Sequence, residues 1–192
     1  MIFFLIIIAA IVLYVLLTYN RFVTMRTRIR ASIQEIGNQL KRQVDLIPNL
    51  EESVKGYLKH ERAIFKELTD ARKAVVAAAS QKDLGKMVQA SGQLQKAIGN
   101  LRVVVESTPE IKGTETVRQL MDELRDTADK VMYARRNLID LTADYNIMRV
   151  TFPSNLVAQT FHFEEEKGLA TPEKGEHLEV GPEETKTPKV KF

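Results

Sequence analysis

The sequence contains no cysteine and no tryptophan, and only three of its 192 residues are histidine. Without cysteine the chain forms no disulfide, no thiolate metal site and no cysteine nucleophile. His60, His162 and His177 are scattered, and no pair has the spacing of metal ligands on one helix. Glycine-rich phosphate loops and the G-x-S-x-G nucleophile motif are missing as well. These absences argue against the common enzyme classes, and we predict no catalytic residue, metal site or cofactor.

The net charge of +3 is distributed unevenly along the chain. Residues 164–192 contain eight Glu and five Lys, which gives −3, so residues 1–163 carry +6. The positive excess begins directly after the apolar start, where few aromatic residues interleave with the arginines and no nucleic-acid-binding motif is present. We therefore predict contact with anionic membrane lipid rather than nucleic acid. The candidate lipid-facing residues are Arg21, Arg26, Arg28 and Arg30.

The first twenty residues carry no charged side chain, and thirteen of the sixteen from 2 to 17 are Ile, Leu, Val or Phe. At roughly −0.4 kcal/mol each, these thirteen favour membrane insertion by about 5 kcal/mol. A helix over residues 2–19 rises about 27 Å, close to the thickness of the hydrocarbon core. The alternative, a cleaved signal peptide, would need a basic start and a small-x-small site, and the run offers neither at its ends.

We therefore predict that residues 1–20 form an uncleaved transmembrane anchor. Arginines flank only its C-terminal side, so the positive-inside rule places the N-terminus outside and residues 21–192 in the cytoplasm. The expected location is the inner, cytoplasmic membrane of the cell, with a single pass.

Beyond the anchor, the apolar residues from 22 to 47 recur every three or four positions with an eleven-residue repeat. This period predicts that the anchor and the first soluble helix form one rod. Proline disfavours helical geometry in the residue before it, so Pro48 is predicted to end the rod. Further amphipathic helices are expected over 48–80, 83–106 and 114–150, with Asp83 as a cap.

The predicted fold class is therefore all-α: an N-terminal transmembrane helix that continues into an antiparallel up-and-down four-helix bundle over residues 21–163. The stretch "PSNLVAQTFHF" predicts a short terminal helix or turn. Residues 164–192 are rich in Glu, Lys, Pro and Gly, which predicts a mostly disordered charged tail. The final "PKVKF" alternates apolar and basic residues, a pattern compatible with a docking segment or with an unstructured end.

Two further groups of residues are candidates for a specific role. If the chain turns at 44–48, then Leu46, Ile47 and Pro48 lie at a distal tip about 40 Å from the membrane. There they either fold back onto the helix ends or form a docking surface. Glu61 and Arg135 each flank an apolar stripe, and we predict a structural ion pair between them, although their depths differ by about 12 Å.

Several of these residues together resemble one family closely. They are Tyr19-Asn20 at the end of the anchor, "LKRQVDLIPNLEESVKGYLKHE" at 40–61, Ala134-Arg135, Tyr145-Asn146, "FPSNLVA" at 152–158 and the closing "PKVKF". In this combination the chain resembles the LemA proteins, bacterial single-pass membrane proteins with a helical cytoplasmic bundle. It departs from them at Leu138 and Ile139, where a second Tyr-Asn pair is usual, and at Val44, where a tyrosine is frequent. The resemblance implies an architecture but no reaction or ligand.

Two functions follow from the residues and the resemblance. The first is a non-enzymatic, membrane-anchored helical scaffold or adaptor that presents bundle surfaces to an unknown protein partner or to a second copy of itself. The second is a membrane-remodelling or envelope-stress component that acts on anionic lipid through its basic membrane-proximal face. An enzymatic function has no constellation of residues to support it.

Overall fold

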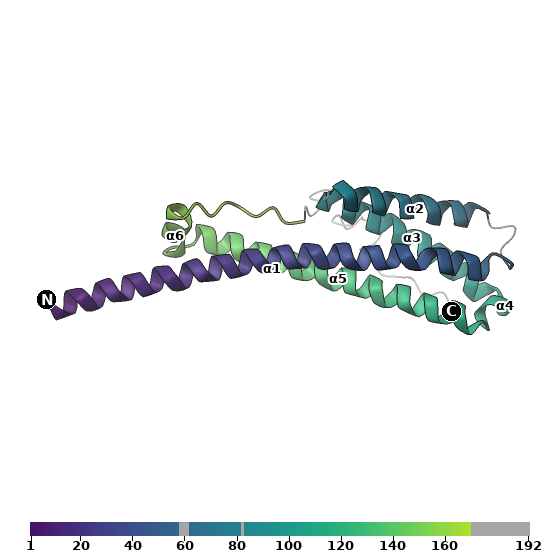
Figure 1. Ribbon diagram of the computed structural model, residues 1–192, viewed down its shortest axis with the longest axis horizontal. Helices are drawn as coiled ribbons and strands as arrows, with labels where there is room; N and C mark the ends of the chain where they lie inside the picture. The colour runs from purple at the N-terminus through teal and green to yellow at the C-terminus, as the bar shows by residue number, and fades with distance from the viewer. Residues whose placement is uncertain (58–61, 82, 170–192) are drawn as a thin grey trace, which may run out of the picture.

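The computed structural model describes residues 1–57, 62–81 and 83–169, and within these residues every regular element is a helix. Figure 1 shows a long, narrow molecule in which one helix extends beyond all the others at the N-terminal end. The helices are α1 (Ile2–Val54), α2 (Arg62–Gln81), α3 (Leu84–Ser107), α4 (Pro109–Lys112), α5 (Glu115–Val150) and α6 (Ser154–Thr160). The predicted all-α class is thus confirmed for the described part of the chain.

The longest element, α1, is one uninterrupted helix of 53 residues, and at 1.5 Å per residue it is about 80 Å long. Its N-terminal run is exposed, whereas from Phe22 onward one side is buried at every third or fourth residue. This is the predicted stripe, and it confirms that the apolar anchor and the first soluble helix form one rod. The stripe packs mainly against α5 and, farther along, against α2 (Figure 1).

The prediction that Pro48 ends the rod was wrong, because α1 continues to Val54 with Pro48 inside it. An interior proline costs about 3 kcal/mol, since it has no N–H to donate and its ring crowds the preceding turn. Ile47, Leu50 and Val54 are all fully buried, and burying each such side chain contributes about 1.5 to 3 kcal/mol. Burial on these last two turns of the helix outweighs the cost of the proline. The turn that leaves α1 begins only at Lys55.

The helices α1 and α5 run antiparallel along most of the length of α5 (Figure 1). Their register is fixed by contacts at several heights. The rings of Phe22 and Tyr145 meet near the membrane-proximal end, Asn137 donates a hydrogen bond to Ser32, and Gln43 donates one to the carbonyl oxygen of Leu124. Moving one residue forward along α1 therefore corresponds in height to moving about one residue backward along α5.

The helices α2 and α3 form a hairpin that packs on the distal part of α1 (Figure 1). Asp83 caps α3 as predicted, with its Oδ1 accepting a hydrogen bond from the Lys86 amide at 3.0 Å. The short α4 joins α3 to α5 and contacts both helices. Between the parts of α3 and α5 that are nearer α4 lies a cleft, described below.

At the membrane-proximal end the chain turns twice beyond α5. The helix ends at Val150, before Pro153, and the short α6 forms within the segment where a helix or turn was predicted. At His162 the backbone enters the left-handed region with φ of 54°, a conformation in which histidine is several-fold enriched. The chain then reverses and runs as an extended segment, Phe163–Leu169, alongside α5 and α1 (Figure 1). We call this segment the strap.

Candidate functional site

The membrane-proximal junction is a cluster of five aromatic rings, drawn from three segments of the chain. Ring centroids are 4.7 Å apart in the stacked pair Phe22–Phe163 and 4.9 Å apart in the edge-on pair Tyr19–Phe161. Tyr145 meets Phe22 edge-on at 5.5 Å. These geometries are favourable for aromatic pairs and add about 0.5 to 1.5 kcal/mol per pair to the burial itself. The cluster joins the end of the apolar run to α5 and to the strap.

The strap is held on α5 by the adjacent residues Tyr145 and Asn146. The Tyr145 hydroxyl donates a hydrogen bond to the Glu164 carbonyl oxygen at 3.0 Å, and burial raises the pKa of this phenol. The Asn146 side chain pairs with the backbone of Glu166 in both directions. Its Nδ2 donates to the Glu166 carbonyl oxygen at 2.9 Å, and its Oδ1 accepts from the Glu166 amide at 3.1 Å. In the strap, the carbonyl of Glu164 and the amide and carbonyl of Glu166 are thus hydrogen-bonded by side chains of α5.

An ion pair completes the attachment of the strap to α1. Arg26 Nε lies 2.6 Å from Glu166 Oε1, and the two side chains are 37% and 22% exposed. The hydrogen bond that Arg26 donates to Glu166 raises the pKa of Arg26, although burial acts in the opposite direction. This arginine therefore faces the strap. Glu165 contributes a second pair, with Arg149 of α5 at 3.3 Å.

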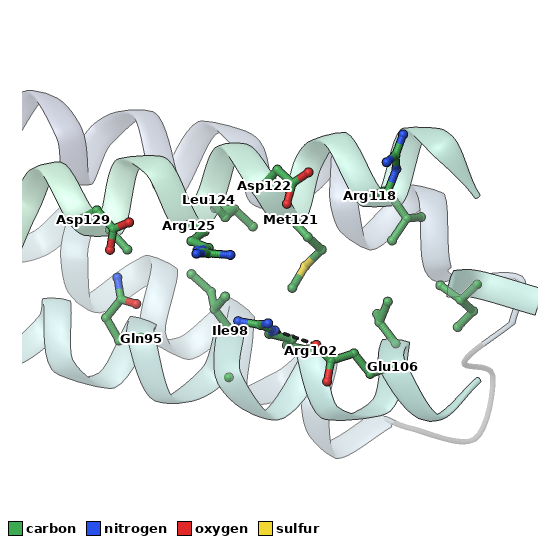
Figure 2. Close-up of a pocket in the computed structure, with 15 residues that line it drawn as sticks. Gln95, Ile98, Arg102, Glu106, Arg118, Met121, Asp122, Leu124, Arg125 and Asp129 are labelled. Carbon is green, nitrogen blue, oxygen red and sulfur yellow. Dashed lines mark hydrogen bonds and ion pairs between the residues drawn. The ribbon is translucent and has the colours of Figure 1, made fainter. Parts of the chain in front are cut away.

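The distal part of the molecule contains a different kind of site, a cleft of about 550 Å³ between α3 and α5. Figure 2 shows Met121 and Arg125 extending from α5 into this space and Ile98 extending from α3. We call this site the distal cleft. Its buried apolar lining is Ile98, Val105, Ile111, Val117 and Leu124, and its charged lining is Arg102, Glu106, Arg118, Asp122, Arg125 and Asp129.

The charges around the distal cleft are paired along each helix and not across it. Arg102 binds Glu106 of its own helix at 2.8 Å, as the dashed line in Figure 2 marks, and Arg118 binds Glu115. No ion pair among the described residues links α3 to α5. In the described residues no three His, Asp or Glu side chains are placed to hold a metal ion. The arrangement of apolar floor and mixed-charge rim is suited to binding an amphipathic segment.

The residues that the sequence singled out are placed as follows. Arg21, Arg28 and Arg30 are exposed on α1, whereas Arg26 is engaged by the strap. Whether any of the four contacts lipid stays a prediction.

Leu46, Ile47 and Pro48 do not form a tip, because the helix continues past them; Ile47 is fully buried and the other two are half-buried. Arg135 is half-buried on α5. Glu61 lies outside the described residues, so the proposed ion pair between Glu61 and Arg135 stays a prediction.

Both sites depend on residues that the sequence reading did not connect. Glu166 was assigned to a charged tail, and nothing in its neighbourhood indicated a partner 140 residues away in α1. One signal was present: Phe161 and Phe163 are apolar aromatics immediately before the acidic run, and Tyr145-Asn146 is an aromatic–amide pair on α5. The distal cleft had no such signal, because its apolar residues have the same spacing as residues packed in a core.

The shape of α1 defines the class of protein. Its N-terminal run is long and apolar enough to cross a membrane, and only 6% of this stretch is buried in the fold, unlike the core helix of a soluble protein. The molecule is a membrane-associated helical protein. A sequence model of the LemA family matches residues 32–192, and the chain belongs to this family.

MamQ proteins of two organisms are similar over most of the chain. The magnetosome protein MamQ of Magnetospirillum gryphiswaldense is 24% identical over 171 residues, which cover 77% of this chain and 63% of the relative. MamQ 2 of Paramagnetospirillum magneticum is 25% identical over 174 residues, covering 79% of this chain and 64% of the relative. The chain thus spans somewhat less than two-thirds of the length of these relatives.

Proposed function

We propose that this chain is a non-enzymatic, membrane-anchored scaffold or adaptor that presents the distal cleft to a protein partner. In this proposal α1, α2, α3 and α5 are the helices of an up-and-down bundle, and the α3–α5 side is left open for the partner. The observation that carries the proposal is the continuity of α1, a single helix from the apolar run to the level of the cleft.

The continuity of α1 sets the height of the cleft above the membrane. Gln43 of α1 bonds to Leu124, which lies on the cleft floor, and Gln43 follows Tyr19 by 24 residues. At 1.5 Å per residue the cleft opens about 36 Å from the end of the apolar run. A partner bound there is held at a defined distance from the bilayer. This is the geometry that an adaptor requires and that an enzyme acting on a soluble substrate does not.

The chemistry of the cleft favours a helical or extended peptide segment as the partner's contact. Five buried apolar side chains form the floor, and acidic and basic residues alternate along the α5 rim: Arg118, Asp122, Arg125 and Asp129. Spacings of three and four residues place these charges on one side of α5. A partner helix with apolar residues at the same spacing would bury the floor and pair with both signs of charge.

The proposal includes the orientation of the chain in the membrane. Four arginines lie within ten residues after Asn20, and the apolar run before them has no charge. Under the positive-inside rule the helices beyond Asn20 are cytoplasmic. A single cysteine in place of Val103, which is 66% exposed on α3, should then resist an impermeant thiol reagent in intact cells and react after lysis. Reaction in intact cells would contradict the orientation.

The test of the scaffold function is site-specific photocrosslinking in cells. A photoreactive amino acid in place of Met121, which extends into the distal cleft, should capture a partner chain. The matched control is the same amino acid at Met132, which is 56% exposed on the same helix and does not line the cleft. Mass spectrometry of the adducts identifies the captured chain, and an adduct of two copies of this chain identifies self-association.

Adducts at Met121 that are absent at Met132 would support docking in the cleft. Equal adducts at the two positions would show that the cleft is not the docking site. If neither position gives an adduct while both variants are present in the membrane, the scaffold function through this cleft is contradicted.

A further inference from the structure

The segment from the end of α5 through α6 is unusually free of charge for this protein. Residues 150–163, "VTFPSNLVAQTFHF", contain no Asp, Glu, Lys or Arg, whereas 28% of the whole chain is charged. No other stretch beyond Asn20 is uncharged over such a length. We call this segment the uncharged tip. It lies beside the N-terminal third of α1, where α6 is seen in Figure 1.

Three large apolar side chains of the uncharged tip point into open space. Phe152 is 75% exposed, Val150 is 63% exposed and Leu156 is 55% exposed. One turn back along α5, Ile147 is 60% exposed as well. Clusters of exposed apolar side chains on one end of a protein mark a site of interaction with a membrane or another protein.

The register between α1 and α5 shows at what height these side chains lie. Tyr145 is level with Phe22, so Val150, five residues farther along α5, is roughly level with Leu17. Thr18 is buried and Tyr19 packs on Phe161, which places α6 against the same part of α1. The uncharged tip therefore overlaps the end of the apolar run, and Val150 lies about 3 Å beyond Tyr19 toward the N-terminus of α1.

Charge appears at one height on all three passes of the chain. The first charged residue of α1 is Arg21, the last before the tip is Arg149, and the first after it is Glu164. Glu164 accepts the hydrogen bond of Tyr145, which is level with Phe22, and Arg149 pairs with Glu165. On the side of this height toward the distal cleft the chain is charged, and on the side toward the N-terminus of α1 every pass is uncharged. Such a boundary is expected where a protein enters the headgroup region of a bilayer.

We propose that the uncharged tip inserts into the interface of the same bilayer that α1 spans, with Val150, Phe152 and Leu156 in contact with lipid. The inference rests on the membrane anchoring in the proposed function. The occupant is lipid because these side chains continue, at the same height, the apolar surface of α1. The tip thus gives the protein a second membrane contact beside its helix, and it fixes the orientation of the α1–α5 pair relative to the bilayer plane.

The absence of cysteine allows a direct test by single spin labels. Full-length protein with one cysteine at Phe152, Leu156, Val103 or Leu5 is labelled and reconstituted into vesicles of phosphatidylethanolamine and phosphatidylglycerol. Collisions of the label with oxygen, which concentrates in lipid, and with a water-soluble nickel chelate are then measured by electron paramagnetic resonance. Val103 is the matched control, since it is 66% exposed on α3, far from the tip.

Labels at Phe152 and Leu156 should lose most of the chelate accessibility that the Val103 label shows and gain accessibility to oxygen. Two positions are used so that a local effect of one label does not decide the result. Chelate accessibility at both positions equal to that at Val103 would overturn the inference, and so would shielding from both reagents, which indicates contact with protein. A Leu5 label that is as accessible to the nickel chelate as the Val103 label would instead contradict the membrane anchoring. The failure of the inference and the failure of the proposed function are therefore distinguishable.

Discussion

The membrane-proximal and distal ends of the α1–α5 pair are packed in different ways. At the proximal end the strap lies against α1 and α5. The ring of Phe163 packs on α1, the backbone of Glu166 is hydrogen-bonded by α5, and the carboxylate of Glu166 pairs with α1. At the distal end α3 stands away from α5, and a cleft of about 550 Å³ with an apolar floor is left between them. The contacts at the proximal end favour a single arrangement of α1, α5 and the strap, whereas the distal end leaves an apolar surface that another molecule can bury.

The largest expected contrast between the two ends is in the cost of truncating an apolar side chain. Phe22→Ala removes a fully buried ring that contacts Phe163 and Tyr145, and should lower the free energy of unfolding by about 3 to 5 kcal/mol. Met121→Ala, in the half-exposed wall of the distal cleft, should cost at most about 1 kcal/mol. Urea titration of the detergent-solubilised protein, followed by circular dichroism, measures both. Equal costs would mean that the cleft wall is packed like the proximal core.

A smaller effect is expected from releasing the strap. Asn146→Ala removes two hydrogen bonds to the backbone of Glu166, each worth about 1 kcal/mol, so the strap should open more often. The Glu166 amide should then exchange with deuterium roughly 30-fold faster, because about 2 kcal/mol of local protection is lost.

The control for this measurement is Asn137→Ala. It removes a hydrogen bond to Ser32 between α5 and α1 but does not touch the strap. Its effect on Glu166 exchange should be small. Unchanged exchange in the Asn146 variant would show that the other contacts of the strap hold it in place without Asn146.

The two ends also provide two ion pairs for comparison. Arg26–Glu166 at the proximal end is 37% and 22% exposed, while Arg42–Glu123, which joins α1 to α5 farther out, is 51% and 38% exposed. Double-mutant cycles should give a coupling energy of about 1 kcal/mol for the first pair and a smaller one for the second, since solvent screens exposed pairs. The Arg26 coupling should also be less sensitive to added salt. A larger coupling at Arg42 would reverse the proposed difference between the ends.

The smallest expected effect concerns Glu51, near the distal end of α1. Burial raises the pKa of this carboxyl above its ordinary value of 4.5, against the attraction of Arg72. An acid whose pKa is raised by folding destabilises the fold as pH increases through and above that value. Glu51→Gln should therefore raise the melting temperature slightly at neutral pH and have no effect below about pH 4, where the carboxyl is protonated in both states. A loss of stability at neutral pH would show that the carboxylate has a stabilising partner.

Much of the secondary structure follows from local signals in the sequence. The uncharged start, the stripe from Phe22 to Ile47, the cap at Asp83 and the stop at Val150 before Pro153 each depend on residues within a few turns of one another. Periodicity and capping are local properties, and the helices that they predict are present, except that the helix predicted over 48–80 is α2 over Arg62–Gln81, while residues 48–54 belong to α1. The resemblance to the LemA proteins was likewise carried by short local motifs, and the family match confirms it.

The features that the sequence alone did not determine depend on contacts between distant residues. Pro48 has a local cost that predicts a helix end, and only the burial of Ile47, Leu50 and Val54 against other helices reverses the balance. Glu166 looks like part of a polar tail until the fold brings it to Arg26 and Asn146. Whether the apolar faces of α3 and α5 meet or leave a cleft depends on how α4 and the α2–α3 hairpin position α3, because spacing along a helix does not encode the distance to its neighbour.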